Sequence, residues 1–203
     1  AHDPLGHRLL DLLTPAEVLD LGTDEAEARG RAAMHDYVLR RLAGGPPTQD
    51  PEAVAQALTE RTGAHDANPF LVARLVTGRL RTTPLDTSVP GWADGMAATL
   101  EQALEADLAD VPAPGPGVDG PQLARRLLTA LTWGLGAGLP LTEWAAVAST
   151  LAPAGTVSEA ELAWILGRLG RYVVQDAESG EAVYRLAHAS FAGSLPAAAT
   201  SAS

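Results

Sequence analysis

The most constraining feature of this 203-residue chain is the order of patterns between Gln122 and Leu195. Three apolar stripes with helical spacing follow one another, and two short runs of β-forming residues come after them. The stripes are Leu123, Leu127 and Leu131; Trp144, Val147, Ala148 and Leu151; and Leu162, Ile165, Leu166 and Leu169. Because each stripe is buried only against a partner, the three helices are expected to pack together.

Local signals mark the ends of these elements. Three glycines end the first helix, Thr142 is placed to cap the second, and Ser158 with Glu161 forms a capping box before the third. The β-forming runs are 172–174 and 183–184, with a polar hairpin loop at 176–180. Three helices followed by a hairpin predict a winged helix.

Helix-period patterns also predict four earlier helices, at 32–42, 51–61, 70–80 and 92–110. The third of these is apolar almost all round from Phe70 onward, so it should be the buried centre of its half. An i+4 stripe that starts at Trp92 predicts one long fourth helix. The acidic stretch 23–31 is expected to be a loop or a helix start, and 18–21 a short strand.

The predicted fold is therefore mainly α. A four-helix, lid-like domain occupies 32–110, and a winged-helix domain with one β-hairpin occupies 122–195. Between them, 111–121 holds four prolines and three glycines, the composition of a linker. Residues 1–31 precede these domains, and 196–203 are a low-complexity tail that is expected to be disordered.

Composition excludes several function classes. The chain has no cysteine, and all 14 basic residues are arginine. This excludes disulfides, thiol catalysis, a Walker A lysine and a Schiff base. The chain alone is therefore predicted not to be an enzyme. No stretch resembles a signal peptide or a membrane span, which favours a cytoplasmic protein without membrane contact.

The charge balance bears on possible partners. A net charge of -11 opposes the phosphate-neutralising role that many winged helices serve, so no DNA partner is expected. The arginines available for a local basic patch are Arg125, Arg126, Arg168 and Arg171. The carboxylates Glu101, Glu105, Asp107 and Asp110 are expected on the outer, solvated face of their helix. The possible metal ligands His2, Asp3, His7 and Asp11 do not all fall on one common face, and they are expected to be surface residues of a start segment, so no metal site is expected.

Several local strings, in this order, resemble the second half of the nucleotide-switch module of actinobacterial STAND ATPases, which include the NACHT and NB-ARC proteins. The strings are Ala16–Leu21, Tyr37–Leu42, Phe70–Val76, Leu139–Trp144 and Tyr184–His188. In that family a P-loop core binds ATP or ADP, a helical domain closes over the base, and a winged helix docks on the nucleotide.

The resemblance implies a regulatory portion of such a switch that begins after the core. Residues 1–31 would then be a remnant of the core and its connecting loop. ADP or ATP would bind only together with the missing core, which would be the main partner, and activation would bring a possible homo-oligomer.

Two nucleotide-contacting residues carry over from the family pattern. Pro69 resembles the proline that packs on the adenine, although the glycine usually found two residues earlier is Ala67 here. The alternative for Pro69 is an ordinary proline at the first position of a helix. His188 resembles the histidine that follows the wing, opens the last helix and reaches the phosphates of ADP. The alternative for His188 is a core histidine bonded to neighbouring backbone.

Two other function classes remain open from the residues alone. One is a winged-helix transcription regulator with an added helical domain, which the negative charge disfavours. The other is a non-catalytic helical module for protein interaction.

Overall fold

The computed structural model describes residues 23–62, 68–134, 136–151, 155–178 and 180–195. As predicted, it is mainly helical (61%), with eight α-helices among the described residues and a small antiparallel sheet near the C-terminal end. The strand expected at 18–21, the four residues considered as metal ligands and the tail 196–203 lie outside the described residues.

The first helix, α2 (Asp24–Leu42), starts eight residues earlier than the predicted Ala32. Thr23 caps it by accepting a hydrogen bond from the Ala26 amide at 3.1 Å. Three acidic residues in the first turn favour the positive end of the helix dipole. Two of them also pair with arginines one turn later. The acidic stretch is therefore the beginning of the helix.

Helices α3 (Pro51–Thr62) and α4 (Pro69–Leu80) follow, each with proline in its first turn as predicted. Six residues of α4 are buried, so it is the centre of this group. Its first turn is different, because the side chain of Phe70 is 46% exposed. The prediction that Phe70 is buried is therefore wrong.

The prediction of one long helix at 92–110 is also wrong. A short 3-10 turn, η1 (Trp92–Gly95), is separated from α5 (Leu100–Ala109) by extended backbone at Met96. Thr99 caps α5 by accepting from the Gln102 amide at 3.2 Å. Because a helical turn on each side keeps the apolar spacing, the i+4 pattern does not reveal the break.

The C-terminal group has the element order of a winged helix. It contains α6 (Gly120–Ala130), η2 (Leu131–Trp133), β1 (Leu139–Pro140), α7 (Leu141–Thr150), α8 (Glu159–Leu169), η3 (Gly170–Tyr172), β2 (Val173–Glu178), β3 (Glu181–Leu186) and α9 (Phe191–Ser194). The capping box of Ser158 and Glu161 is present as predicted.

The sheet differs from the predicted hairpin in two respects. It has three antiparallel strands in the order β1-β3-β2, with Leu139 opposite Tyr184. In addition, β2 continues through Glu178, so most of the expected loop 176–180 is strand. A two-residue strand carries no alternation that a sequence can show.

Strand β1 also moves the start of the next helix. Since Leu139 and Pro140 pair with β3, α7 begins directly at Leu141, and Pro140 stands at its N-cap position. Thr142 lies inside the helix and does not cap it, contrary to the prediction. Leu151 at its other end is 40% exposed rather than part of the buried stripe.

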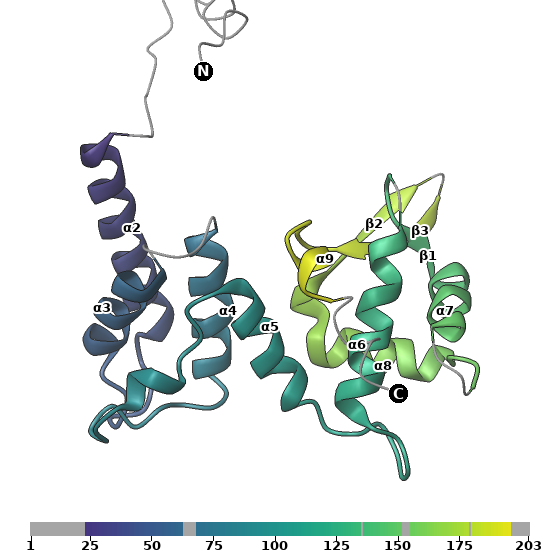
Figure 1. The fold of residues 1–203 in the computed structure, drawn as a ribbon, viewed down its shortest axis with the longest axis horizontal. Helices are drawn as coiled ribbons and strands as arrows, with labels where there is room; N and C mark the ends of the chain where they lie inside the picture. Colours follow the sequence, from purple (N-terminus) through teal and green to yellow (C-terminus); the bar gives the residue numbers. More distant parts are fainter. Residues whose placement is uncertain (1–22, 63–67, 135, 152–154, 179, 196–203) are drawn as a thin grey trace, which may run out of the picture.

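Figure 1 shows helices α2–α4 on one side, the α6–α9 group on the other, and α5 running between them. The structure has no helix or strand between Ala109 and Gly120. The two ends of this segment meet, because a Cβ on Gly120 would lie 2.6 Å from the Val111 carbonyl oxygen. One continuous apolar cluster includes Leu58 and Leu104 as well as Leu127 and Leu162, so the core extends through both groups.

Candidate functional site

Pro69 is the first residue of α4 and is half-buried. This is the position at which a helix tolerates proline, since the first amide has no partner within the helix. Asn68 stands at the N-cap position before it, and its backbone carbonyl accepts hydrogen bonds from the amides of Leu71 and Val72. The local geometry thus matches the ordinary N-terminal proline. It also leaves the ring at the surface beside Phe70.

His188 lies in the bend between β3 and α9, and it is half-buried. The expectation that it opens the last helix is wrong, because α9 starts at Phe191 and is only four residues long. A single turn has a negligible dipole, so no helix end assists this side chain. The His188 ring lies edge-on to Phe191, with 6.5 Å between their ring centroids.

The two ring nitrogens of His188 have different surroundings. Nδ1 accepts a hydrogen bond from the Ser190 amide at 3.2 Å, so it carries no proton. The neutral imidazole therefore carries its proton on Nε2. Nε2 has no hydrogen-bond partner in the described part of the chain. The ring is held by backbone, as a core histidine would be, yet it keeps one donor available.

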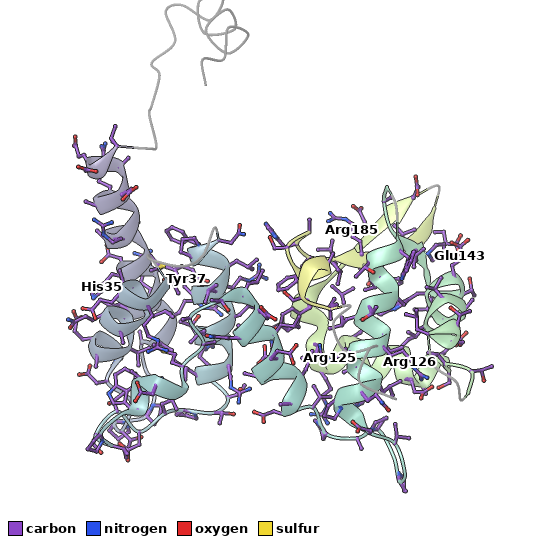
Figure 2. All side chains as sticks on the ribbon, in the orientation of Figure 1. His35, Tyr37, Arg125, Arg126, Glu143 and Arg185 are labelled. Carbon is purple, nitrogen blue, oxygen red and sulfur yellow. The ribbon has the colours of Figure 1, made fainter. Side chains whose placement is uncertain are left out.

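The fold brings the Pro69 and His188 segments together. Asn68 Nδ2 donates to Ser190 Oγ at 3.3 Å, although the two residues are 122 positions apart. Tyr37 of α2 extends this surface by packing edge-on against Phe70, at 6.3 Å between ring centroids. Figure 2 shows Tyr37 on the face of α2 that is turned toward α4. Residues Tyr37, Asn68, Pro69, Phe70, His188 and Ser190 are called the Pro69/His188 surface below.

The structure also brings together two sets of charges that the sequence left separate. The carboxylates of α5 were expected to be solvated, but Asp107 is only 5% exposed. Glu105 pairs with Arg125 of α6, and Asp107 pairs with Arg171 of η3. Figure 2 shows Arg125 on the side of α6 nearest α5 and Arg126 on the other side. The acidic helix and part of the basic patch therefore face each other.

Asp107 is the centre of this contact. Its Oδ2 accepts hydrogen bonds from the Tyr172 hydroxyl and from Arg171 Nε, the latter at 3.0 Å. Arg79 of α4 approaches the other oxygen, with Nη1 3.5 Å from Oδ1. A carboxylate removed from water needs such charged donors to offset its lost hydration. An open recess of about 370 Å³ beside it is lined by Arg79, Asp110, Arg168 and Arg171, among others.

The sequence contains a signal that identifies Asp107. It lies three residues after Leu104 and seven after Leu100, which places it on the same face of α5 as the apolar stripe. A carboxylate at such a position requires a buried partner. The sequence could not name that partner, because Arg171 and Tyr172 are more than 60 residues away.

The contact of Asp107 with Arg171 and Tyr172 changes the pKa values of the latter two residues. Burial raises the pKa of Tyr172 far above its ordinary value of 10, and the nearby charge of Asp107 raises it further. For Arg171 burial opposes the charge, but hydrogen bonding and attraction to Asp107 outweigh this and raise its pKa. Tyr172 is therefore a hydroxyl donor, and Arg171 a cation, throughout the ordinary pH range.

The Tyr172 shift predicts a loss of stability at alkaline pH. The folded chain holds the Tyr172 hydroxyl proton more tightly than the unfolded chain does. The stabilisation that Tyr172 gives to the folded chain is therefore intact below pH 10 and is lost as the pH rises above it. Above pH 10 the unfolding free energy should fall by up to about 1.36 kcal/mol per pH unit because of this one group. Tyr172→Phe lacks this group, so the difference in unfolding free energy between the two proteins should narrow above pH 10. Urea unfolding at pH 8 to 11 measures the unfolding free energy of both proteins. A difference between them that stays constant over this pH range would contradict the prediction.

Two other kinds of site are absent from the described residues. No helix there is both long and apolar enough to span a bilayer. No group of three or more histidine, aspartate or glutamate side chains there is placed to hold a metal ion. Comparison with protein-family models, curated proteins and solved structures found no match for this chain.

Proposed function

We propose that this chain is the regulatory helical and winged-helix portion of a STAND-type ATP/ADP signalling switch. It contacts nucleotide only together with a P-loop core, on its own polypeptide or on a companion chain. The observation that carries the proposal is the Asn68–Ser190 hydrogen bond, which sets the Pro69 and His188 segments side by side. In such a switch, the corresponding two segments contact the adenine and the phosphates.

The chemistry of the Pro69/His188 surface supports this role. Phe70 is 46% exposed and Pro69 is half-buried, so an apolar area is available for a flat base. The Nε2 donor of His188 suits a phosphate oxygen, because a hydrogen bond to a charged acceptor is stronger than one between neutral groups. The chain's own residues supply contacts to the ends of a nucleotide. The P-loop core would supply the lysine and magnesium chemistry.

The proposal predicts the effect of His188→Ala in a polypeptide that joins this chain to a P-loop core. One lost hydrogen bond to a charged group corresponds to about 1.5 to 3 kcal/mol, so ADP affinity should fall roughly ten- to 150-fold. ATP affinity should fall less, because the resting, ADP-bound state is the one that uses this contact. Nucleotide titration by calorimetry measures both affinities.

His35→Ala is the matched control for this experiment. His35 is also a half-buried histidine, but it lies on α2 and pairs with Glu52 of α3 at 3.1 Å. Its substitution should leave both affinities unchanged. An unchanged ADP to ATP affinity ratio in His188→Ala, together with a lower melting temperature, would show that His188 is only a core histidine.

A further inference from the structure

Helices α4 and α5 and the segment between them form a small apolar pocket with a volume of about 140 Å³. The apolar residues that line it are Leu75, Val76 and Leu80 of α4, Leu85 and Met96 of the connecting segment, and Ala103 of α5. A cavity of roughly 150 Å³ with apolar walls holds one benzene molecule. The apolar pocket is therefore large enough for one aromatic ring.

Long-range hydrogen bonds hold the walls of the apolar pocket that lie outside the helices. The Leu85 amide donates to Oε1 of the buried Gln49 at 3.0 Å. Arg61 Nη2 donates to the Met96 carbonyl at 3.4 Å. The extended backbone at Met96, which interrupts the predicted long helix, lets this residue line the pocket together with α4. Because these walls are ordered before a ligand enters, binding costs little conformational entropy.

The apolar pocket adjoins the open recess of about 370 Å³ beside Asp107. Arg79, Thr83 and Asp107 line both spaces, so the two meet at these residues. The charged residues that line the recess are Arg79, Asp107, Asp110, Arg168 and Arg171. Three guanidinium groups and two carboxylates give a formal charge of +1, in a chain whose net charge is -11. The recess is therefore a local exception that favours an anion.

Two hydrogen-bond donors in the recess are not used within the described part of the chain. Arg79 and Arg171 pair with the two aspartates. The guanidinium of Arg168, in contrast, has no ion pair or hydrogen bond among the described residues, and neither has the Thr83 hydroxyl. Both side chains are exposed. A guanidinium and a hydroxyl are suitable donors to the oxygens of a phosphate or carboxylate group.

Gly167 leaves additional space in the recess beside Arg168. It lies within α8, where glycine is less favourable than alanine. A Cβ at this position would meet no atom within 4 Å, so packing among the described residues does not require a glycine here. Since Gly167 lines the recess, the missing side chain allows a ligand to approach the helix backbone closely.

We propose that the apolar pocket and the recess form one binding site for a small aryl oxyanion, a single aromatic ring that carries a phosphate or carboxylate group. The ring occupies the apolar pocket. The anionic group lies in the recess, where Arg168, Arg171 and the Thr83 hydroxyl donate to its oxygens. The ligand thus contacts α4 and α5 as well as α8. This site shares no residue with the Pro69/His188 surface and needs no P-loop core, so it does not depend on the function proposed above.

The test is the affinity of this chain for phenyl phosphate and for benzoate, measured by calorimetry without nucleotide. Inorganic phosphate and benzyl alcohol are the comparison ligands. Because the ring is buried, the tighter-binding aryl anion should exceed inorganic phosphate by at least about tenfold in affinity. It should exceed benzyl alcohol by roughly three- to tenfold, because benzyl alcohol lacks the charge. The order of phenyl phosphate and benzoate identifies the anionic group.

Ala106→Leu and Arg168→Gln test the two parts of the site separately. Ala106 lines the apolar pocket but not the recess, so a larger side chain there takes the place of the ring. The affinity for the aryl anion should fall at least about tenfold. Arg168 is exposed, so its replacement leaves the core intact. The affinity should then fall roughly three- to tenfold, because an exposed charged contact is weaker than a buried one.

Arg40→Gln is the matched control, since Arg40 is also exposed but lies on α2 and lines neither space. It should leave the affinity unchanged. If Ala106→Leu does not fold, Gly167→Leu decides, because it narrows the recess from an exposed position without touching the core. It should lower the affinity at least about threefold. The proposal is overturned if neither aryl anion binds at millimolar concentration, or if Arg168→Gln and Gly167→Leu bind as tightly as Arg40→Gln.

Discussion

Replacing Trp144 by alanine is expected to lower the free energy of unfolding by about 3 to 5 kcal/mol, the range for truncating a fully buried tryptophan. Trp144 has no exposed surface. Its indole Nε1 donates to the Leu127 carbonyl of α6 at 2.8 Å, and its ring lies 5.5 Å from that of Tyr184 in β3. The substitution therefore removes the side chain that joins α6, α7 and the sheet. Urea unfolding followed by circular dichroism measures the change.

Trp133→Ala is the matched control for this prediction. Trp133 is 66% exposed, so its removal should change the unfolding free energy by no more than about 0.5 kcal/mol. Equal losses in the two variants would mean that the winged-helix core is not built around Trp144.

Gly138→Ala is expected to lower the unfolding free energy by roughly 2 to 5 kcal/mol, through strain and through collision. Gly138 has a φ of +125°, and an added Cβ would lie 2.4 Å from the Tyr184 carbonyl oxygen. The adjacent pair Leu139 and Tyr184 joins β1 to β3, so the added carbon would push this strand away from the sheet. The same unfolding experiment tests this.

Gly136→Ala separates the two causes. Gly136 also has a positive φ, +66°, but an added Cβ there meets no atom within 4 Å. It should cost only about 1 to 2 kcal/mol, the strain of a left-handed residue. If Gly138→Ala costs no more than Gly136→Ala, the close approach of Gly138 to β3 does not constrain the sheet.

The sequence predicts features that depend on neighbours along the chain. The capping box of Ser158 and Glu161 and the proline at the start of α4 are local hydrogen-bonding patterns, and both appear in the structure. The stripe of α6 and, except for the half-buried Leu166, that of α8 likewise become buried core, because a helical period fixes which residues share a face. The mainly helical fold class and the hairpin follow from the same short-range physics.

Other features depend on which surfaces meet, and the sequence alone misplaces them. Phe70 has the spacing of a core residue, yet its side chain is 46% exposed and packs edge-on against Tyr37 of α2. Strand β1 exists only because β3 lies beside it.

The candidate site shows the same division between local and long-range determinants. The histidine and the proline can be named from short strings, but their proximity results from the packing of helices α6–α9 and the sheet against helices α2–α5. Asp107 shares a helical face with Leu100 and Leu104, which the sequence shows. That this face meets Arg171 and Tyr172 was decided by the tertiary structure, since only folding places residues 64 and 65 positions apart within hydrogen-bonding distance.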